Sequence, residues 1–135
     1  VISAYVAPNF TENGWGLTRA PQGLVEELRQ ALIQGMSQNP PEEYDHAGLV
    51  EGPQEPLFIE ANSLIDKALH ELKPFHEAWS GIPLVEQNAY GLRVYRNDSS
   101  LRMHVDISRS HVISCILHID HDPESEPWPI VIEDF

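Results

Sequence analysis

Two side chains that can bind a metal ion, His104 and Asp106, stand two positions apart directly after a stretch with strand-like character. In an extended chain, side chains at positions i and i+2 point to the same side, so both can reach one ion. An imidazole, a carboxylate and a second imidazole form the three-residue ligand set of non-haem Fe(II) sites, which leaves coordination positions open. The pair therefore predicts part of an iron site, and its third ligand has to be found.

The sequence around this pair favours it over a chance occurrence. With 7 histidines in the chain, a His-x-Asp triplet is a weak motif, and a second copy spans residues 118–120. The first copy follows a strand pattern, a turn at residues 97–100 and a short second strand, and a long apolar strand comes after it. This context places His104 and Asp106 at the open end of a sheet.

Two amphipathic helices are predicted in the first half of the chain. Apolar residues recur with the 3.6-residue period of a helix at Leu24, Val25, Leu28, Ala31, Leu32 and Met36, and again at Leu64, Ile65, Ala68, Leu69 and Leu72. Pro74 either kinks the second helix or ends it. Residues 40–56, which are rich in proline and show no period, predict a long irregular loop.

Strands are predicted after residue 81, over residues 89–95, 101–105, 111–119 and 129–132. Helices followed by strands indicate an α+β layout or a β-barrel buttressed by helices. In the third strand, Ser114 and His118 share one face, and Cys115 lies on the opposite face, which we expect to pack under the helices. In the first strand, Arg93 and Tyr95 share a face that points either into a pocket or to water.

Charge and composition exclude several classes of partner. Acidic residues number 21 against 8 basic residues, which gives a net charge of −13 and a repulsive average field for nucleic acid. No stretch approaches the length of about 18 apolar residues that a membrane helix needs. The single cysteine, Cys115, cannot form an internal disulfide, which favours a reducing, cytoplasmic compartment. We therefore expect neither a nucleic-acid partner nor a membrane-spanning segment.

From about residue 90 to residue 135, the sequence resembles the 2-oxoglutarate- and Fe(II)-dependent oxygenases, in particular their prolyl 4-hydroxylase-like and aspartyl/asparaginyl β-hydroxylase-like branches. In the prolyl hydroxylase branch, a strand of the form Leu-x-Val-x-x-Tyr precedes a turn and then His-x-Asp, with the tyrosine nine positions before the histidine. Here Tyr95 stands nine positions before His104, and Leu92 and Val94 precede the tyrosine as in that pattern. The tyrosine directly follows the valine, whereas the family places other residues between them.

The resemblance implies a double-stranded β-helix, or jelly roll, in which His104 and Asp106 are catalytic residues and two of the three Fe(II) ligands. It implies 2-oxoglutarate as co-substrate and hydroxylation of an amino-acid side chain, either free or in a peptide or protein. Candidate contacts to 2-oxoglutarate are Tyr95, Ser114 and His118. Arg102 and Arg109 bracket the His-x-Asp, where they either bind a carboxylate of the substrate or lie solvated on the rim.

The sequence departs from the family because the distal histidine and the Arg or Lys that binds 2-oxoglutarate are not in this chain. We expect a single domain over residues 1–135, with residues 1–80 as helical and loop support and residues 81–135 as the first strands of an incomplete barrel. The chain is then either a fragment or a degenerate relative.

Two other functions stay open from the sequence. The first is a cupin-like module that holds a metal or ligand without oxidative chemistry, and the second is an acidic protein-interaction domain. A further alternative concerns His118, Asp120, His121 and Asp122, which either hold a divalent ion or form an ordinary polar loop.

Overall fold

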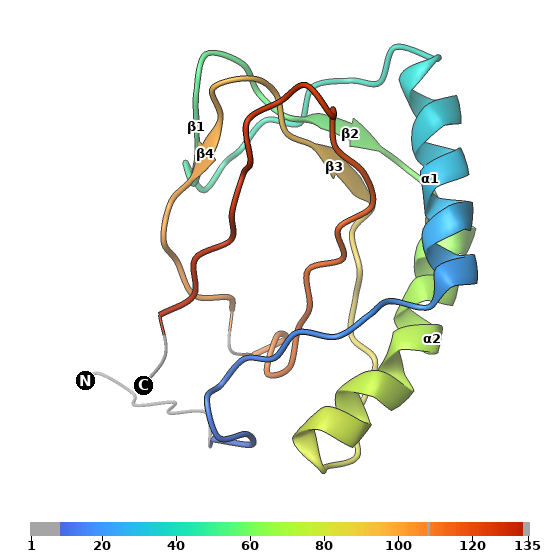
Figure 1. The fold of residues 1–135 in the computed structure, drawn as a ribbon, viewed down its shortest axis with the longest axis vertical. Coiled ribbons are helices and arrows are strands. Elements are labelled where there is room, and N and C mark those ends of the chain that lie inside the picture. Colours follow the sequence, from blue (N-terminus) through green and yellow to red (C-terminus); the bar gives the residue numbers. More distant parts are fainter. Residues whose placement is uncertain (1–8, 108, 134–135) are drawn as a thin grey trace.

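The computed structural model describes residues 9–107 and 109–133, and over these residues it is an α+β structure of helices and short antiparallel strand pairs (Figure 1). In chain order the elements are α1 (Gln22–Met36), β1 (Val50–Glu51), β2 (Leu57–Ile59), α2 (Asn62–Ser80), β3 (Leu92–Val94) and β4 (Ser100–Leu101). Strand β1 pairs with β4, and β2 pairs with β3, both antiparallel. The α+β class predicted from the sequence is confirmed, and the strand pairs do not themselves form a jelly roll.

Helix α1 forms where the apolar period predicts it. It starts after Pro21, whose φ is −55°, and it ends before Asn39, which adopts a positive φ of 51°. Leu24 and Leu28 lie one turn apart on one face, and each is only 2% exposed. The burial of this face fixes α1 against the rest of the protein.

Helix α2 continues through Pro74 rather than ending there. A proline inside a helix removes one backbone donor, and the neighbouring turns keep their own hydrogen bonds. The helix ends at Gly81, which adopts a φ of 72° that glycine reaches without strain, and the Gly81 N–H donates to the Glu77 carbonyl at 2.8 Å. From the sequence, Pro74 could either kink the helix or end it. The structure shows one helix that continues across the proline.

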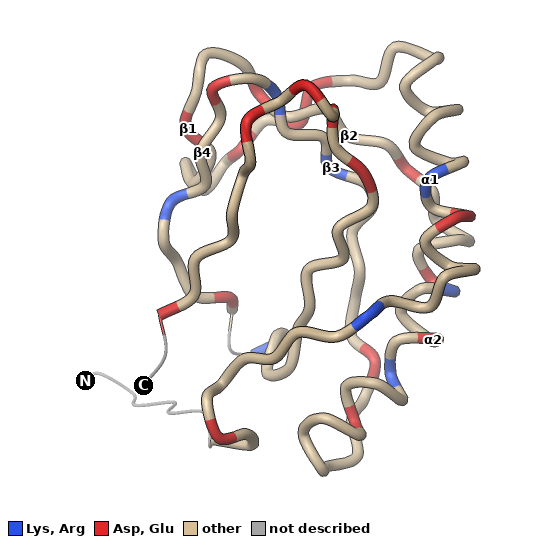
Figure 2. Tube along the Cα trace, viewed as in Figure 1, with Lys and Arg blue, Asp and Glu red and all other residues tan. Residues whose placement is uncertain are grey.

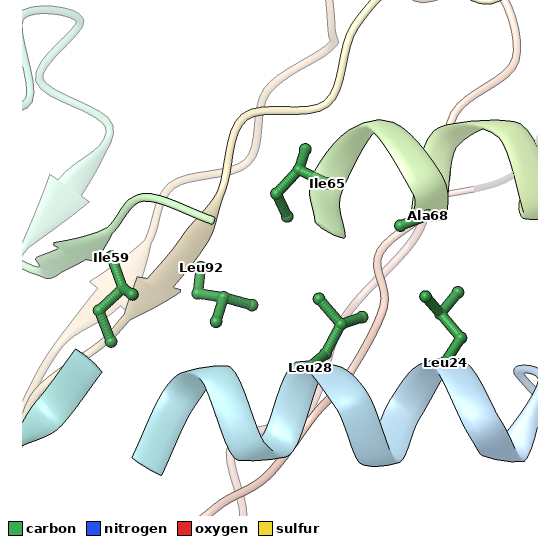
Figure 3. Packing of buried hydrophobic residues seen from close by; sticks show 6 residues of the cluster. All are labelled: Leu24, Leu28, Ile59, Ile65, Ala68 and Leu92. Atoms are coloured by element: carbon green, nitrogen blue, oxygen red, sulfur yellow. The ribbon is translucent and has the colours of Figure 1, made fainter. Parts of the chain in front are cut away.

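The core lies between the two helices and the β2–β3 pair (Figure 3). Its buried members are Leu24 and Leu28 of α1, Ile65 and Ala68 of α2, Ile59 of β2 and Leu92 of β3. Leu117 and Ile119 pack against this cluster from the C-terminal part of the chain. The same core therefore orients both helices, the β2–β3 pair and one stretch of the C-terminal segment.

The strand predictions hold only in part. The predicted strand over residues 89–95 is shortened to β3 (Leu92–Val94), and the one over residues 101–105 overlaps β4 only at Leu101. Residues 111–119 and 129–132 are not strands: the chain bends at residues 112 and 113, and the rest of both stretches has no helix or strand (Figure 1). A strand needs a neighbouring backbone that completes its hydrogen bonds, and alternating apolar residues do not provide one. Strand β1 lies inside residues 40–56, where the sequence predicted only a loop.

The C-terminal half leaves much apolar surface uncovered. The accessible surface is 10611 Å², compared with about 7,100 Å² for a folded monomer of 15.2 kDa. Val105 is 91% exposed, Ile116 76% and Val131 68%. Cys115 is also exposed, so the expectation that it packs in the core is wrong. Leu117 and Ile119, which pack against the core, come after the cysteine in this stretch.

Two glycines of α1 provide a test of how closely this helix approaches β2. A Cβ atom at Gly35 would lie 2.5 Å from Cγ2 of Ile59, a buried β-branched residue with little freedom to move. A Cβ atom at Gly23 would meet no atom within 4 Å. We expect Gly35→Ala to destabilise the protein by about 1–3 kcal/mol through overpacking. We expect Gly23→Ala to stabilise it by up to about 1 kcal/mol, because alanine favours the helix.

Urea unfolding of the two variants beside the wild type measures both effects. The Gly23→Ala protein is the matched control, since it carries the same change in the same helix. Stabilisation by both substitutions would contradict the close approach of α1 to β2.

Candidate metal centre

The backbone that carries His104 is held at its start by β1. Val50 lies opposite Leu101 in the β1–β4 pair, and the Arg102 N–H donates to the Leu49 carbonyl at 2.9 Å. The Arg102 guanidinium binds the Glu51 carboxylate, with Nε to Oε1 at 2.6 Å. Arg102 is thus fixed through its main chain and its side chain, two positions before His104.

The imidazole of His104 has a defined hydrogen-bond partner. Its Nδ1 lies 2.7 Å from the backbone carbonyl oxygen of Arg102. Because a carbonyl only accepts, Nδ1 carries the proton, and in the neutral ring the lone pair is then on Nε2. That Nε2 atom lies 3.9 Å from Oδ1 of Asp106. The free nitrogen lone pair and a carboxylate oxygen therefore lie on the same side of the chain, as the i and i+2 spacing predicts.

Ser114 orients the carboxylate of Asp106. Its Oγ donates to Oδ2 of Asp106 at 3.0 Å, across eight positions of sequence. A turn brings the two residues together, because the N–H groups of Ser110 and His111 both donate to the Ile107 carbonyl. The hydrogen bond occupies Oδ2 and leaves Oδ1 facing His104. Hydrogen bonds of this kind hold metal ligands in the orientation that an ion requires.

The spacing of the two donor atoms is close to what one metal ion needs. Two ligands at about 2.1 Å from an ion and at right angles to each other lie about 3 Å apart. The observed 3.9 Å between Nε2 and Oδ1 calls for a small side-chain adjustment. Within residues 9–107 and 109–133, no group of three or more His, Cys, Asp or Glu side chains could hold an ion. After that adjustment, Nε2 of His104 and Oδ1 of Asp106 can both reach one ion.

Tyr95 is placed by β3 and by the C-terminal segment. Its ring packs against Trp128 with a centroid distance of 4.4 Å, and its hydroxyl accepts from Nη1 of Arg93 at 3.5 Å. Arg93 also donates through Nε and Nη2 to both carboxylate oxygens of Glu43, and this pairing raises the pKa of Arg93. The polar face of β3 is therefore occupied by an ion pair, and these contacts do not link Tyr95 to His104.

The other predicted site residues lie apart from the His104–Asp106 pair. Nε2 of His118 lies 3.2 Å from Nδ1 of His121, and both rings are exposed. Arg102 is engaged by Glu51, so a substrate carboxylate would have to displace Glu51 from it. Arg109 is exposed near the turn that follows Ile107. The structure thus joins His104, Asp106 and Ser114, and Arg102 contacts His104 through its backbone carbonyl. The side chains of Tyr95, Arg102 and His118 contact other residues.

Asp45 supports the site from a distance, and no prediction from the sequence included it. Its Oδ2 accepts from the Val50 N–H at 2.7 Å, and its Oδ1 accepts from the Ala47 N–H at 3.2 Å. The hydrogen bond from Val50 is the main reason that the pKa of Asp45 lies below its ordinary value. An aspartate that accepts hydrogen bonds from backbone N–H groups a few positions later is typical of an Asx turn. The signal in the sequence was an aspartate inside the irregular loop over residues 40–56.

Acidic residues are spread over both helices and the connecting loops, and basic residues are few (Figure 2). In the described part of the chain, neither helix has the length and apolar character needed to cross a membrane. Comparison with protein-family models, curated proteins and solved structures finds no match to this chain. The resemblance to the oxygenases therefore rests on the residues of the sequence itself.

The role of Asp45 predicts a pH dependence. Because its pKa is lower in the folded protein, its carboxylate contributes stability above about pH 4 and loses this contribution as the pH falls through the folded-state pKa. In the wild type, we expect acidification to reduce the hydrogen-exchange protection of the Val50 and Arg102 amides, after correction for the intrinsic rates. In Asp45→Asn, protection should be lower at neutral pH and should no longer show this acid-dependent loss.

The control is Asp66→Asn, which changes an exposed aspartate on α2. Its Val50 and Arg102 amides should behave as in the wild type. Unchanged protection of both amides in Asp45→Asn would show that the β1–β4 pair does not depend on this carboxylate.

Proposed function

We propose that this protein is an Fe(II)- and 2-oxoglutarate-dependent dioxygenase that hydroxylates an amino-acid or peptidyl side chain, of prolyl or aspartyl/asparaginyl type. The observation that carries the proposal is the pairing of Nε2 of His104 with Oδ1 of Asp106, in which a backbone carbonyl leaves the imidazole lone pair free. An imidazole nitrogen and a carboxylate oxygen are two of the three donors that non-haem Fe(II) uses in such enzymes.

In this proposal, each residue has a distinct task. His104 and Asp106 hold the iron, which together with 2-oxoglutarate supplies the activation of O₂. Ser114 keeps Oδ1 of Asp106 turned toward His104 through its bond to Oδ2. Tyr95 and His118 remain the proposed contacts to 2-oxoglutarate, with Ser114 as a further candidate. Arg102 and Arg109 are proposed to bind a carboxylate of the substrate.

We further propose a jelly roll as the architecture around this site. Residues 111–119 and 129–132 carry exposed apolar side chains, such as Ile116 and Val131. Contact of apolar side chains with water is unfavourable. Pairing with further strands would bury these side chains and complete the backbone hydrogen bonds of both stretches.

The proposed substrate is a peptide, a protein or a free amino acid. The net charge of −13 argues against a nucleic-acid substrate. A cytoplasmic location remains part of the proposal, because a lone cysteine without an internal partner suits a reducing compartment.

The proposal predicts a spectroscopic result that depends on His104. Under anaerobic conditions, the protein titrated with Fe(II) and then with 2-oxoglutarate should develop the weak visible charge-transfer band of chelated 2-oxoglutarate. His104→Ala removes the nitrogen donor, so the band should be lost, together with turnover of 2-oxoglutarate to succinate. The fold should be retained, because the His104 ring makes no part of the core. Circular dichroism checks the fold.

His70→Ala is the matched control, since His70 is an exposed histidine of α2. It should leave the band unchanged. Iron binding without a band would favour a cupin-like module without oxidative chemistry. Absence of iron binding would favour an acidic protein-interaction domain, and either result would overturn the oxygenase proposal.

The hydrogen bond from Ser114 to Asp106 predicts a smaller effect. Ser114→Ala keeps both metal ligands and removes the group that orients the carboxylate. We expect apparent Fe(II) affinity to fall by about 10–100-fold, as is typical when a partner of a metal ligand is lost. Ser125→Ala removes a serine hydroxyl that donates to the Asp122 carbonyl, and it should have no effect. Equal affinities in the two variants would remove Ser114 from the site.

A further inference from the structure

Two exposed histidines form a close pair outside the His104–Asp106 site. Nε2 of His118 and Nδ1 of His121 lie 3.2 Å apart, with ring centroids 5.3 Å apart and ring planes at 44°. The sequence alone left these residues as either ion ligands or parts of a polar loop. Their mutual approach is a feature that the tertiary structure adds.

The backbone between the two histidines is fixed on α1. Nη2 of Arg29 donates to the Ile119 carbonyl at 3.3 Å, and Nε of Arg29 lies 3.5 Å from Oδ2 of Asp120. The other carboxylate oxygen of Asp120 accepts from the His121 N–H at 2.9 Å. The Ile119 side chain also packs against the core. The two imidazoles therefore project from a segment that is held in place, which lowers the entropy lost when both bind one ligand.

We propose that His118 and His121 chelate a divalent cation of the borderline class that includes Zn²⁺ and Ni²⁺. Two nitrogen donors at about 2.1 Å from one ion, separated by an angle between a right angle and the tetrahedral value, lie about 3.0–3.4 Å apart. The observed 3.2 Å falls inside this interval, and each exposed ring has to turn so that its lone pair points at the ion instead of at the other nitrogen. Water completes the coordination.

The nitrogen donors and the negative charge around them both determine which ion this site binds. Imidazole nitrogen suits Zn²⁺, Ni²⁺ and Cu²⁺, whereas Mg²⁺ and Ca²⁺ require oxygen donors. Four acidic residues lie within and just after the pair, at Asp120, Asp122, Glu124 and Glu126, and their field raises the local concentration of cations (Figure 2). With two protein donors, the bound ion is exchangeable and keeps open positions.

Binding needs no net release of protons near neutral pH. In the free protein, one ring donates its N–H to the lone pair of the other. In the complex, both facing nitrogens give their lone pairs to the ion, and the shared proton moves to the other nitrogen of its own ring. An imidazole that carries a proton on both ring nitrogens has no lone pair to give, so protons compete with the ion for these donors.

Zinc titration of the His104→Ala protein tests the site without interference from the other metal-binding candidate. Isothermal titration measures affinity, and long-range ¹H–¹⁵N spectra identify which ring nitrogens respond. We expect saturable binding with shifts at Nε2 of His118 and Nδ1 of His121. In His104→Ala/His121→Ala, affinity should fall by at least about tenfold, because a direct ligand is lost. His104→Ala/His70→Ala is the control, and it should bind as the single variant does.

Three results would overturn the proposal: no saturable binding, equal affinity with and without His121, or shifts confined to other histidines. Any of them would reduce the pair to an ordinary N–H···N hydrogen bond. His104→Ala/His121→Gln, which keeps a polar side chain at the exposed position, gives the same comparison if the alanine variant folds poorly. Melting temperature is a poor substitute, because two ligands three positions apart also chelate in the unfolded chain.

Discussion

The burial of one face of α1 is the interaction on which the rest of the structure depends. Leu24 and Leu28 are each 2% exposed, and α2 and the β2–β3 pair pack around them. The approach is close enough at Gly35 that a single methyl group would meet Ile59. Arg29, which directly follows Leu28 in the same helix, contacts the Ile119 carbonyl and the Asp120 carboxylate. One helix thus orders both the core and a stretch of chain that lies about 90 positions away in sequence.

The His104–Asp106 pair has a different support. It follows β4, whose partner β1 is held by the carboxylate of Asp45. A backbone carbonyl and the Ser114 hydroxyl orient these two side chains through hydrogen bonds. Directional bonds suit the proposed metal site, because a metal ligand must be oriented as well as placed. They also leave the pair exposed, so that its two donor atoms are accessible from solvent.

Apolar surface is distributed unevenly between the two halves of the protein. The helices bury their apolar faces against each other and against β2–β3, as the 3.6-residue period requires. The stretches after β4 carry a similar density of apolar side chains and leave most of them in contact with water. The contrast follows from geometry, because a helix satisfies its own backbone and needs one neighbour, whereas an extended segment needs neighbours for its backbone as well as for its side chains.

The sequence by itself determined the features that depend on neighbouring positions. The 3.6-residue period located α1 and α2, and the i and i+2 spacing placed His104 and Asp106 on one side of the chain. Only the tertiary structure decided which strands pair, that α2 continues past Pro74, that Ser114 reaches Asp106, and that His118 meets His121. The alternation over residues 111–119 reports which side chains share a face, but it contains no information about a partner strand. Local periodicity follows from backbone geometry within a few residues, whereas pairing between distant segments depends on which competing contacts bury the most surface.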